Sequence, residues 1–592
     1  MNLTKTDIIN ELINYRGDLS SLIIQKRKLL KNFINKNQKK TCSVSFIGGY
    51  TTEEICDWAK IFMLIEGVDI DVKPSLWGGV HEIAPSHNIA ENLSEIFVLF
   101  CSWRDLYNIT LVEDSNFEIV FKEISKFVEV SISQGKTCII IPFDQPHFDI
   151  LLSDQTSIVS KIVELNSKIF EMQKNNPLLI VMPKDDLLIE RGLPISPNRD
   201  WHLYGRLLSV EAEIFLAFRL SRLLINIISS RKKVLVVDLD NTIWGGIIGD
   251  DGVENIKLGP ETPIGRVFWE IQSYLLMLKR KGIILAVCSK NELDNAIGGL
   301  SHPYSLLKKS DFSAFKSNWD PKSKNIKLIA DELNLGLESF VFLDDNIFER
   351  QEVMNSLPSV SVPDIGEDES QFIKILNQLD YFGSYIPNTN EDYKRVEMYS
   401  QESLRNTESN KFDDFDSFLE SLNIEVCIYH PNKNNYERVI QLSNKTNQFN
   451  LTTFRVDLKH LLSYLKDKNK EILVLEAKDK FGSYGLVSVC YLSFENDNAV
   501  IDNWLMSCRA FGKKLENEMI KAIIKLSISK NTKKIFGYYI PTKKNRYVEN
   551  IYPNFGFKII KSDDNDRYVY VLDIDKFDFL KFNSSCRVSY EF

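Results

Sequence analysis

The sequence lacks long apolar runs and clustered cysteines. It contains no apolar stretch of about 18 residues, which excludes an ordinary transmembrane helix. Its first residues, MNLTKTDIINELINYRG, lack the apolar core of a signal peptide. The nine cysteines are scattered, without a CxxC pair or zinc-ligand spacing, so neither a zinc site nor a disulfide framework is indicated. We therefore expect a cytoplasmic protein with reduced thiols and no contact with a membrane.

The sequence also lacks a net excess of positive charge. The net charge of −9 carries no signature of nucleic-acid binding, although an acidic surface can still hold local basic pockets for phosphates. No internal repeat or long low-complexity tract is present, which argues against a solenoid. The 592 residues are 44% apolar and 26% charged, as in ordinary globular proteins. At roughly 100–200 residues per domain, three or four domains are expected.

Short apolar runs bounded by Gly, Pro or polar residues alternate with segments of helical length in most of the chain, which predicts a multidomain α/β fold with parallel strands. The run KKVLVVDLD opens a second α/β unit, and a polar, charged stretch follows that unit. The expected parts are a helical segment 1–40, an α/β domain 41–230, a central domain 231–385, a linker 386–415 and a mixed α and β domain 416–592.

The most informative motif is DLDNT, which follows the apolar run VLVV and contains Asp238 and Asp240. Ligands bind at the carboxyl ends of parallel strands. Two carboxylates two residues apart can diverge there around one cation, so that one attacks phosphorus and the other handles the proton of the leaving group. Mg²⁺ would neutralise the phosphoryl charge that repels a carboxylate nucleophile. Taken alone, the motif fits an acidic turn equally well.

Three further pieces follow in chain order. The run GIILAVCS ends at Ser289, whose hydroxyl can bind a phosphoryl group. Lys322, in NWDPKSKN, can pair with the nucleophile and the phosphate. FVFLDD ends at Asp344 and Asp345, which can supply metal ligands. Each piece is weak by itself, because a surface Lys is usually solvated and an Asp at a strand end often caps a helix. Together, in this order, they favour a phosphoryl-transfer site.

These motifs resemble the haloacid-dehalogenase superfamily. The resemblance implies that Asp238 is the nucleophile and Asp240 the general acid and base. It also implies that the phosphoryl group is held by Thr242, Ser289 and Lys322. The same resemblance implies a Mg²⁺ site formed by Asp238, Asp344, the carbonyl of Asp240 and, through water, Asp345.

Four longer segments resemble, more narrowly, the FkbH-like branch (subfamily IIIC): DLDNTIWGGIIGDDG, AVCSKNE, NWDPKSKNI and FVFLDDNIFER. About 46 residues separate Thr242 from Ser289, and about 32 separate Ser289 from Lys322. Neither interval is long enough for a large cap domain, so we expect a Rossmannoid parallel sheet with an open site. An open site suits a bulky substrate, or closure by neighbouring domains.

The C-terminal domain resembles the acetyltransferase (GNAT) fold, with the segment SCRAFGKKLE in place of its RxxGxG/A loop. In that fold the loop grips a pyrophosphate at a helix N-terminus. Here Lys514 stands at the second Gly position, which puts ordinary acetyl-CoA binding in doubt. Arg509, Gly512 and Lys513 would instead meet the phosphopantetheine arm of a carrier protein. The alternative is a domain that only packs. In NQFN, Asn447 and Asn450 are either part of a substrate loop or caps of a polar turn.

The N-terminal domain resembles a flavodoxin-like or degenerate SGNH-hydrolase domain. At the position of the family's nucleophile it has Gly48-Gly49-Tyr50-Thr51, without a Ser. Asp200 and His202 are of the residue types that form the acid–base pair later in the sequences of that family, but no Ser stands in place to complete the catalytic group. A scaffold or docking role is therefore expected rather than catalysis.

Two cysteines are candidates for an acyl-thioester intermediate. Cys288 directly precedes Ser289, and Cys508 adjoins the expected pantetheine loop. The alternative for Cys288 is an ordinary buried strand residue. The resemblance implies an enzyme that takes 1,3-bisphosphoglycerate, removes phosphate at Asp238 and loads a glyceroyl unit onto an acyl carrier protein. The alternatives are a stand-alone phosphatase of a small metabolite and a non-catalytic docking protein in polyketide or surface-glycan biosynthesis.

Overall fold

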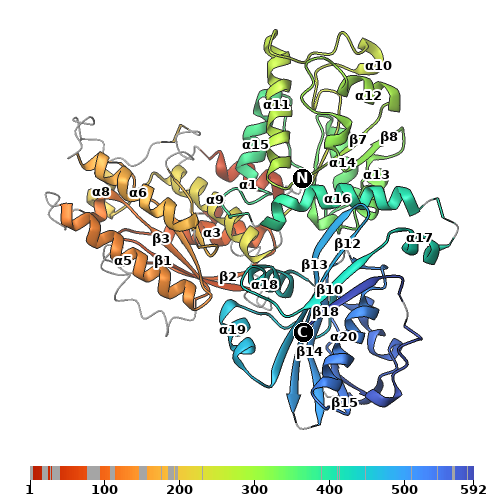
Figure 1. Ribbon diagram of the computed structural model, residues 1–592. Helices are drawn as coiled ribbons and strands as arrows, with labels where there is room; N and C mark the ends of the chain where they lie inside the picture. The colour runs from red at the N-terminus through yellow and green to blue at the C-terminus, as the bar shows by residue number, and fades with distance from the viewer. Residues whose placement is uncertain are drawn as a thin grey trace. The chain divides into compact units, whose positions relative to one another are not determined.

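The computed structural model shows an α/β chain, with three separate sheets among the residues that it describes (Figure 1). This confirms the predicted multidomain α/β fold with a central parallel sheet. No helix among the described residues has both the length and the apolarity needed to span a bilayer. The structure describes residues 5–15, 24–26, 28–29, 41–75, 94–106, 114–145, 157–174, 176–184, 192–193, 198–229, 231–388, 390–409, 411–412, 414–446, 448–495, 497–507, 510–542, 544–562, 567–582 and 584–592.

The first compact unit contains Met1–Lys233 together with Val362–Asn388. Its five strands are parallel and lie in the order β2-β1-β3-β4-β5. The strands are β1 (Cys42–Ile47), β2 (Ile70–Lys73), β3 (Ile96–Phe100), β4 (Thr137–Ile141) and β5 (Leu179–Val181). The helices are α1 (Lys5–Ile13), α3 (Glu53–Ile65), α5 (Asp114–Ser133), α6 (Ile158–Lys174), α8 (Asn198–Tyr204), α9 (Val210–Ile228) and α15 (Phe372–Leu379), with short 3-10 turns η1 (Trp103–Leu106) and η4 (Glu369–Gln371).

Residues 362–385, which the sequence-based boundaries assign to the central domain, and residues 386–388, which they assign to the linker, cluster with this first unit. Two buried arginines of α9 account for the association. Arg219 donates to the carbonyl oxygens of Asn377 and Gln378, and Arg222 Nε donates to Leu379 O at 2.7 Å. The last carbonyl groups of a helix have no hydrogen-bond donor within the helix. The two arginines donate to these carbonyl groups of α15, and the hydrogen bonds also satisfy the buried guanidinium groups.

The second unit contains Val234–Ser361 and Thr389–Phe592. Its first part is a parallel sheet in the order β8-β7-β6-β9, in which β6, β7 and β9 are buried throughout and β8 is buried only at Ala314. The strands are β6 (Val234–Val237), β7 (Ile284–Ser289), β8 (Ala314–Ser317) and β9 (Phe340–Leu343). The helices are α10 (Ile248–Asp251), α11 (Pro263–Arg280), α12 (Leu293–Leu300), α13 (Lys322–Glu332) and α14 (Ile347–Ser356), with 3-10 turns η2 (Lys309–Asp311) and η3 (Leu337–Ser339).

All of residues 231–388 are described, and the interval between β6 and β7 holds only α10 and α11. The interval between β7 and β8 holds only α12 and the turn η2. No additional sheet is inserted in either interval of this described stretch. The carboxyl edge of the sheet therefore carries short loops and no large cap.

The C-terminal part of the second unit is a mostly antiparallel nine-stranded sheet in the order β16-β17-β15-β14-β13-β12-β10-β18, with β11 beside β14. Strands β14 and β15 run parallel, and their pairing covers only Asn498–Ile501. The strands are β10 (Glu425–Tyr429), β11 (Phe449–Asn450), β12 (Lys470–Asp479), β13 (Gly482–Glu495), β14 (Asn498–Met506), β15 (Lys534–Tyr539), β16 (Lys558–Ser562), β17 (Tyr568–Asp573) and β18 (Arg587–Glu591). The helices are α16 (Asn390–Ser409), α17 (Phe415–Ser421), α18 (Tyr436–Lys445), α19 (Leu458–Lys466), α20 (Leu515–Ser529) and α21 (Ile551–Asn554), with 3-10 turns η6 (Arg546–Val548) and η7 (Ile574–Lys576).

Candidate active site

The strand register of the central sheet brings two aspartates together. Strand β6 pairs in parallel with β9, with Val237 opposite Leu343. Asp238 follows β6 directly and Asp344 follows β9 directly, and the backbone N–H of Asp238 donates to Leu343 O at 2.9 Å. Adjacent parallel strands that end in register present their next residues at the same edge, so both carboxylates emerge side by side.

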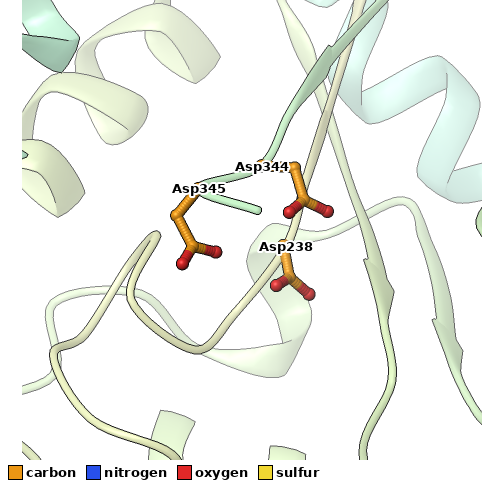
Figure 2. A group of neighbouring side chains, drawn as sticks. All are labelled: Asp238, Asp344 and Asp345. Carbon is orange, nitrogen blue, oxygen red and sulfur yellow. The ribbon is translucent and has the colours of Figure 1, made fainter. Parts of the chain in front are cut away.

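Asp238, Asp344 and Asp345 form one compact acidic group (Figure 2). Each offers a carboxylate oxygen, and these oxygens lie within 4.8 Å of one another. Burial and the neighbouring Asp238 carboxylate raise the pKa of Asp344 to about 7 and the pKa of Asp345 to about 6. Oδ1 of Asp238 is buried and has no hydrogen bond, although it has an ion pair with Lys322. Crowded, partly unsatisfied carboxylate oxygens are the donor set that a divalent cation prefers.

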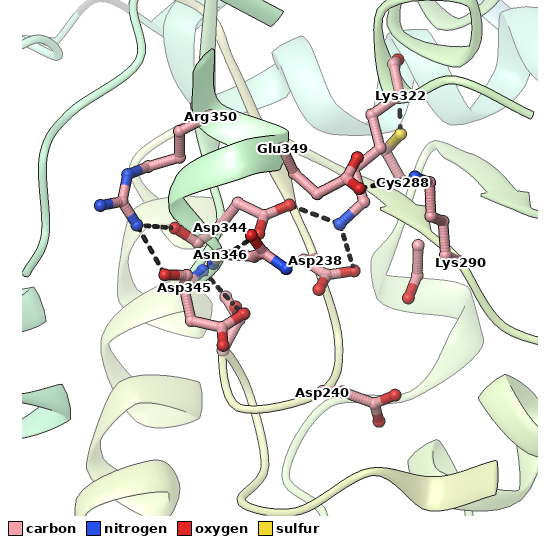
Figure 3. Close-up of polar contacts among 12 residues, drawn as sticks. Asp238, Asp240, Cys288, Lys290, Lys322, Asp344, Asp345, Asn346, Glu349 and Arg350 are labelled. Atoms are coloured by element: carbon pink, nitrogen blue, oxygen red, sulfur yellow. Dashed lines mark hydrogen bonds and ion pairs between the residues drawn. The ribbon is translucent and has the colours of Figure 1, made fainter. Parts of the chain in front are cut away.

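Lys322 supplies the positive charge inside this group (Figure 3). Its side chain is almost fully buried at the start of α13, with Nζ 3.0 Å from Asp238 Oδ1 and also bonded to Asp344 Oδ2. Burial lowers the pKa of Lys322, but the two carboxylates outweigh it and the net shift is upward. The ammonium group therefore stays charged, at the place where a phosphoryl group attacked by Asp238 would need a cation.

The loop after β9 is held by a residue that sequence reasoning missed. Arg350, buried in the first turns of α14, donates from one Nη atom to the carbonyl oxygens of Asp344 at 2.9 Å and Asp345 at 2.7 Å. The backbone N–H of Asn346 donates to Asp344 Oδ1 at 2.9 Å, and the N–H of Asp345 donates to Thr242 Oγ1 at 3.3 Å. These bonds fix both carboxylates, and they place the Thr242 hydroxyl on the acidic loop.

Asp240 lies apart from the three-carboxylate group, as Figure 3 shows. Its carboxylate accepts three hydrogen bonds, from Trp244 Nε1 at 2.8 Å, from the backbone N–H of Ile248 at 3.2 Å and from Asn291 Nδ2 at 2.9 Å. Its side chain is therefore outside the ligand set, which fits the predicted use of its carbonyl for the metal and its carboxylate for proton transfer.

Asn291 is the second residue that sequence reasoning missed. It is buried in the loop after β7, and its Nδ2 donates both to Asp240 Oδ2 and to Ser289 Oγ, at 2.9 and 3.2 Å. One amide thus links the expected acid–base residue to the expected phosphoryl-binding hydroxyl. Its position two residues beyond Ser289, within the segment AVCSKNE, is the only sequence signal that pointed to it.

Replacing Asn291 with Ala should lower turnover while the protein remains folded. The change removes a hydrogen bond to a carboxylate, worth about 1.5–3 kcal/mol, so we expect about a 10- to 100-fold fall in kcat for any phosphate monoester that the site hydrolyses. Steady-state kinetics check the loss, and circular dichroism checks the fold. A kcat within twofold of the wild type would show that Asn291 does not position Asp240.

Cys288 does not fit the predicted role of an acyl carrier. Its side chain is fully buried, its Sγ donates to Lys322 O at 3.7 Å, and burial raises its pKa well above that of a free thiol. A thioester needs a thiolate that the acyl donor can reach. The alternative, a buried strand cysteine, describes Cys288 as the structure has it. Cys508 lies outside the described residues.

Lys513 of the C-terminal loop has a partner within the protein. Lys513 is nearly buried, with Nζ 2.7 Å from Glu402 Oε1 on α16 and stacked over the ring of Tyr484. Its ammonium group is thus paired with a carboxylate of the protein, which argues against the predicted contact, and that contact stays a prediction. Gly512 has a φ of +72°, and Lys514, with a φ of +57°, pairs with Asp416. Arg509 lies outside the described residues.

Asn450, the second asparagine of the NQFN segment, forms hydrogen bonds within the protein. Asn450 is buried, its Nδ2 donates to Thr446 O at 3.1 Å, and its Oδ1 accepts from the N–H of Thr453 at 2.9 Å. The next residue, Leu451, bonds to Trp504 O and accepts from the N–H of Ile540, which joins the ends of β14 and β15. Asn450 thus matches the polar-turn alternative. Asn447 lies outside the described residues.

The strand ends of the first unit carry no nucleophile at the predicted position. After β1, Ser75 closes the Gly48-Gly49 turn by accepting from the Gly48 N–H at 2.8 Å and donating to the Gly48 O at 2.7 Å, and Thr51 bonds to Tyr204 O. After β5, the buried Lys184 donates to Cys101 O and Pro142 O and lies 3.5 Å from Asp144. His202 is exposed on α8, and the side chain of Asp200 lies outside the described part. The arrangement fits a scaffold.

Comparison with known proteins supports the central assignment. No protein-family model and no curated protein sequence matches the chain. A solved structure that does match is the N-terminal part of the protein BF1531 from Bacteroides fragilis, which contains a phosphatase domain complexed with Mg. The identity is 27% and the TM-score 0.56, over 60% of this chain and 98% of that one. This share is larger than the central sheet and its helices, so the likeness extends beyond them.

Two acetyltransferase structures also match. They are the spermidine N-acetyltransferase of Vibrio cholerae, in complex with CoA and spermine, and the GNAT domain of S. lividans PAT, at 14% and 9% identity. They cover 26% and 25% of this chain and 97% and 89% of their own, each with a TM-score of 0.21. At that score they support no statement about the C-terminal domain. The structure with the phosphatase domain is the one that shows a haloacid-dehalogenase-like fold in this chain.

Proposed function

We propose that this protein is a magnesium-dependent phosphatase that uses Asp238 as its nucleophile. The observation that carries the proposal is the group of buried Asp238 and Asp344, both paired with the ammonium of Lys322, and half-buried Asp345, at the carboxyl edge of a parallel sheet. The phosphatase domain of the Bacteroides fragilis protein, crystallised with Mg, has a similar fold.

The residues present suit a magnesium ion. Asp238, Asp344 and Asp345 would hold it, together with the carbonyl of Asp240, because hard oxygen donors are the ligands that Mg²⁺ takes. When bound, the ion would neutralise phosphoryl charge beside the nucleophile. The raised pKa values of Asp344 and Asp345 are consistent with this, since they reflect repulsion and burial that a cation relieves.

The chain's own groups divide the remaining work. A carboxylate oxygen of Asp238 attacks phosphorus, while Lys322 and the Ser289 hydroxyl hold the phosphoryl oxygens. Asp240 donates a proton to the departing oxygen of the substrate. It then accepts a proton from the water that cleaves the aspartyl phosphate, which releases phosphate, frees the Asp238 carboxylate and returns Asp240 to its protonated form. The hydrogen bonds from Trp244 and Asn291 hold the Asp240 carboxylate in place for these two transfers.

The finer proposal concerns the substrate. We propose that the phosphate is removed from a three-carbon acyl unit derived from 1,3-bisphosphoglycerate and carried by an acyl carrier protein, as the resemblance to FkbH-like proteins implies. The open carboxyl edge, without a large cap, supports a substrate that is attached to another protein. Cys288 takes no part. The eight described cysteines are free thiols, which fits the predicted cytoplasmic location.

Intact-protein mass spectrometry tests the finer proposal. The protein, Mg²⁺, 1,3-bisphosphoglycerate and a phosphopantetheinylated carrier protein are mixed, and both proteins are weighed. A dephosphorylated glyceroyl unit on the carrier is the expected result. Release of phosphate without an adduct on either protein would favour a stand-alone phosphatase. No phosphate release and no adduct would favour a non-catalytic docking protein.

The affinity for Mg²⁺ should rise with pH. Protons compete with the metal for Asp345 and Asp344, whose pKa values are about 6 and about 7. We therefore expect binding to strengthen between about pH 5 and 7 and to level off above it, with proton release on binding near pH 6. Because the folded pKa of Asp344 is raised above 3.8, the metal-free protein should also lose stability as pH rises from about 4 to about 7.

Isothermal titration calorimetry in two buffers of different protonation enthalpy measures both the affinity and the protons released. The exposed Asp331 of α13 provides a matched control, since Asp331→Asn removes a carboxylate from the surface and should leave the profile unchanged. A Mg²⁺ affinity independent of pH over this range would contradict the assigned ligands.

A further inference from the structure

Exposed apolar side chains surround the charged site. Each of the four strands of the central sheet is followed by a loop or helix start that contributes at least one exposed apolar side chain. Exposure of apolar surface to water is unfavourable, so a group of such side chains can mark a binding site. These residues are Ile247 after β6, Leu293 after β7, Trp319 after β8, and Ile347 and Phe348 after β9. They lie at the carboxyl edge of the sheet because every one of them follows a strand end there.

Trp319 differs from the others because it is both exposed and fixed. The side chain is 68% exposed, yet its indole N–H donates to Glu292 Oε1 at 2.9 Å. An exposed aromatic ring that is oriented by a hydrogen bond from a neighbouring loop loses little entropy when a ligand stacks on it.

The loop that carries Trp319 is tied to the Asp240 side of the site. The backbone N–H of Asn318 donates to Ser289 O at 3.1 Å, and Ser317 Oγ donates to Asn291 O at 2.7 Å. Asn291 in turn donates to the carboxylate of Asp240. Since Asp240 is assigned to protonate the departing oxygen, the indole stands on the side where the leaving group of a substrate would lie.

The charges nearby favour an uncharged leaving group. Three exposed carboxylates lie in the same loops and helix starts, and the cation of Lys290 is already paired with Glu349 at 2.5 Å. A leaving group with a further anionic group would be repelled there. The three carboxylates are Asp250, Glu292 and Asp294, whereas Asp320 is half-buried and paired with Lys324.

We propose that Trp319 is a specificity-determining residue that binds the leaving group, and that the preferred substrates are phosphate monoesters of uncharged alcohols with an apolar face large enough to stack on an indole. The inference rests on the proposed phosphatase function and names a substrate class for the same site that is an alternative to the three-carbon acyl unit, which has no apolar face of that size. The proposal leaves the cleavage of the phosphorus–oxygen bond unchanged. The alcohol oxygen still leaves with the proton of Asp240, and the proposal adds only the contact between Trp319 and the rest of the alcohol.

A matched pair of substrates tests this. Benzyl phosphate and ethyl phosphate both release an alcohol, but only benzyl phosphate carries a ring. We expect the wild type to prefer benzyl phosphate, and Trp319→Ala to lower the benzyl-to-ethyl ratio of kcat/KM by about 3- to 10-fold, mainly through KM for the benzyl ester. Trp319→Phe should retain most of the preference. Glu292→Ala, which releases the indole, should lower the ratio less than Trp319→Ala does. A benzyl phosphate that bears a ring carboxylate should be a poorer substrate than benzyl phosphate.

Leu328, an exposed apolar residue on α13, provides the control, since Leu328→Ala should leave the ratio unaltered. An unchanged ratio in Trp319→Ala, with both esters still hydrolysed, would overturn the inference alone. Failure of the wild type to hydrolyse either ester in the presence of Mg²⁺ would overturn the proposed function, and the inference with it.

Discussion

Replacing Asp238 with Asn should abolish phosphatase activity, with a fall in kcat/KM of more than about 10³-fold. An amide oxygen carries no charge, so it cannot attack phosphorus as a carboxylate does. The substitution keeps the shape of the side chain and removes one of three crowded anions, so the pKa values of Asp344 and Asp345 should fall toward ordinary values. The variant should therefore remain folded.

Phosphate release in the presence of Mg²⁺ measures this effect, and acid-quenched peptide mass spectrometry of the wild type should find the phosphoryl group on Asp238. Asp331→Asn is again the matched control, because it removes an exposed carboxylate of the same domain. An Asp238→Asn variant with more than about a tenth of wild-type activity would exclude the proposed nucleophile.

The central site could be predicted because its residues are set by strand ends. Asp238, Ser289 and Asp344 each lie at or directly after the end of a short buried strand, and the carboxyl ends of parallel strands share one edge. The positions of Asn291 and Arg350 could not be predicted in this way. Each acts through hydrogen bonds to another loop, and which loop faces which depends on the sheet order β8-β7-β6-β9.

The orientation of the Cys288 side chain could have been predicted from the sequence. Successive residues of a strand point to opposite faces of the sheet. Since Ser289 Oγ meets the Asn291 amide on the Asp240 side, the side chain one residue earlier in β7 should lie elsewhere, and Sγ indeed meets the backbone of Lys322. The contacts of Lys513 had no such signal, because its partner Glu402 is 111 residues away in the chain.

Replacing Lys322 with Met should both inactivate and destabilise the central domain. Met is of similar length and apolar, so the packing is kept while the buried cation is lost. The carboxylates of Asp238 and Asp344 would then face each other without the cation that now contacts both. Breaking a buried ion pair by removing one partner costs about 3–5 kcal/mol, and we expect a loss of that size in the metal-free protein.

The loss should be larger at pH 8 than at pH 5. In the variant the buried carboxylates are more costly to ionise, so their pKa values rise further, and the folded state takes up protons that the unfolded state releases. Stability then falls as pH rises through those folded pKa values. Mg²⁺ should restore part of the stability, since it supplies positive charge to the same oxygens. It should not restore turnover, because the phosphoryl group still lacks its ammonium partner.

Scanning calorimetry measures the stability, and hydrogen–deuterium exchange of the peptides that contain β6 and β9 assigns the loss to the central sheet. Lys324→Met is the matched control on the same helix. Lys324 is exposed and pairs with Asp320 at 3.0 Å, so its loss should cost no more than about 0.5 kcal/mol. If the two variants were equally stable at both pH values, the Lys322 ammonium would not be the cation that makes the buried carboxylates of Asp238 and Asp344 tolerable in this fold.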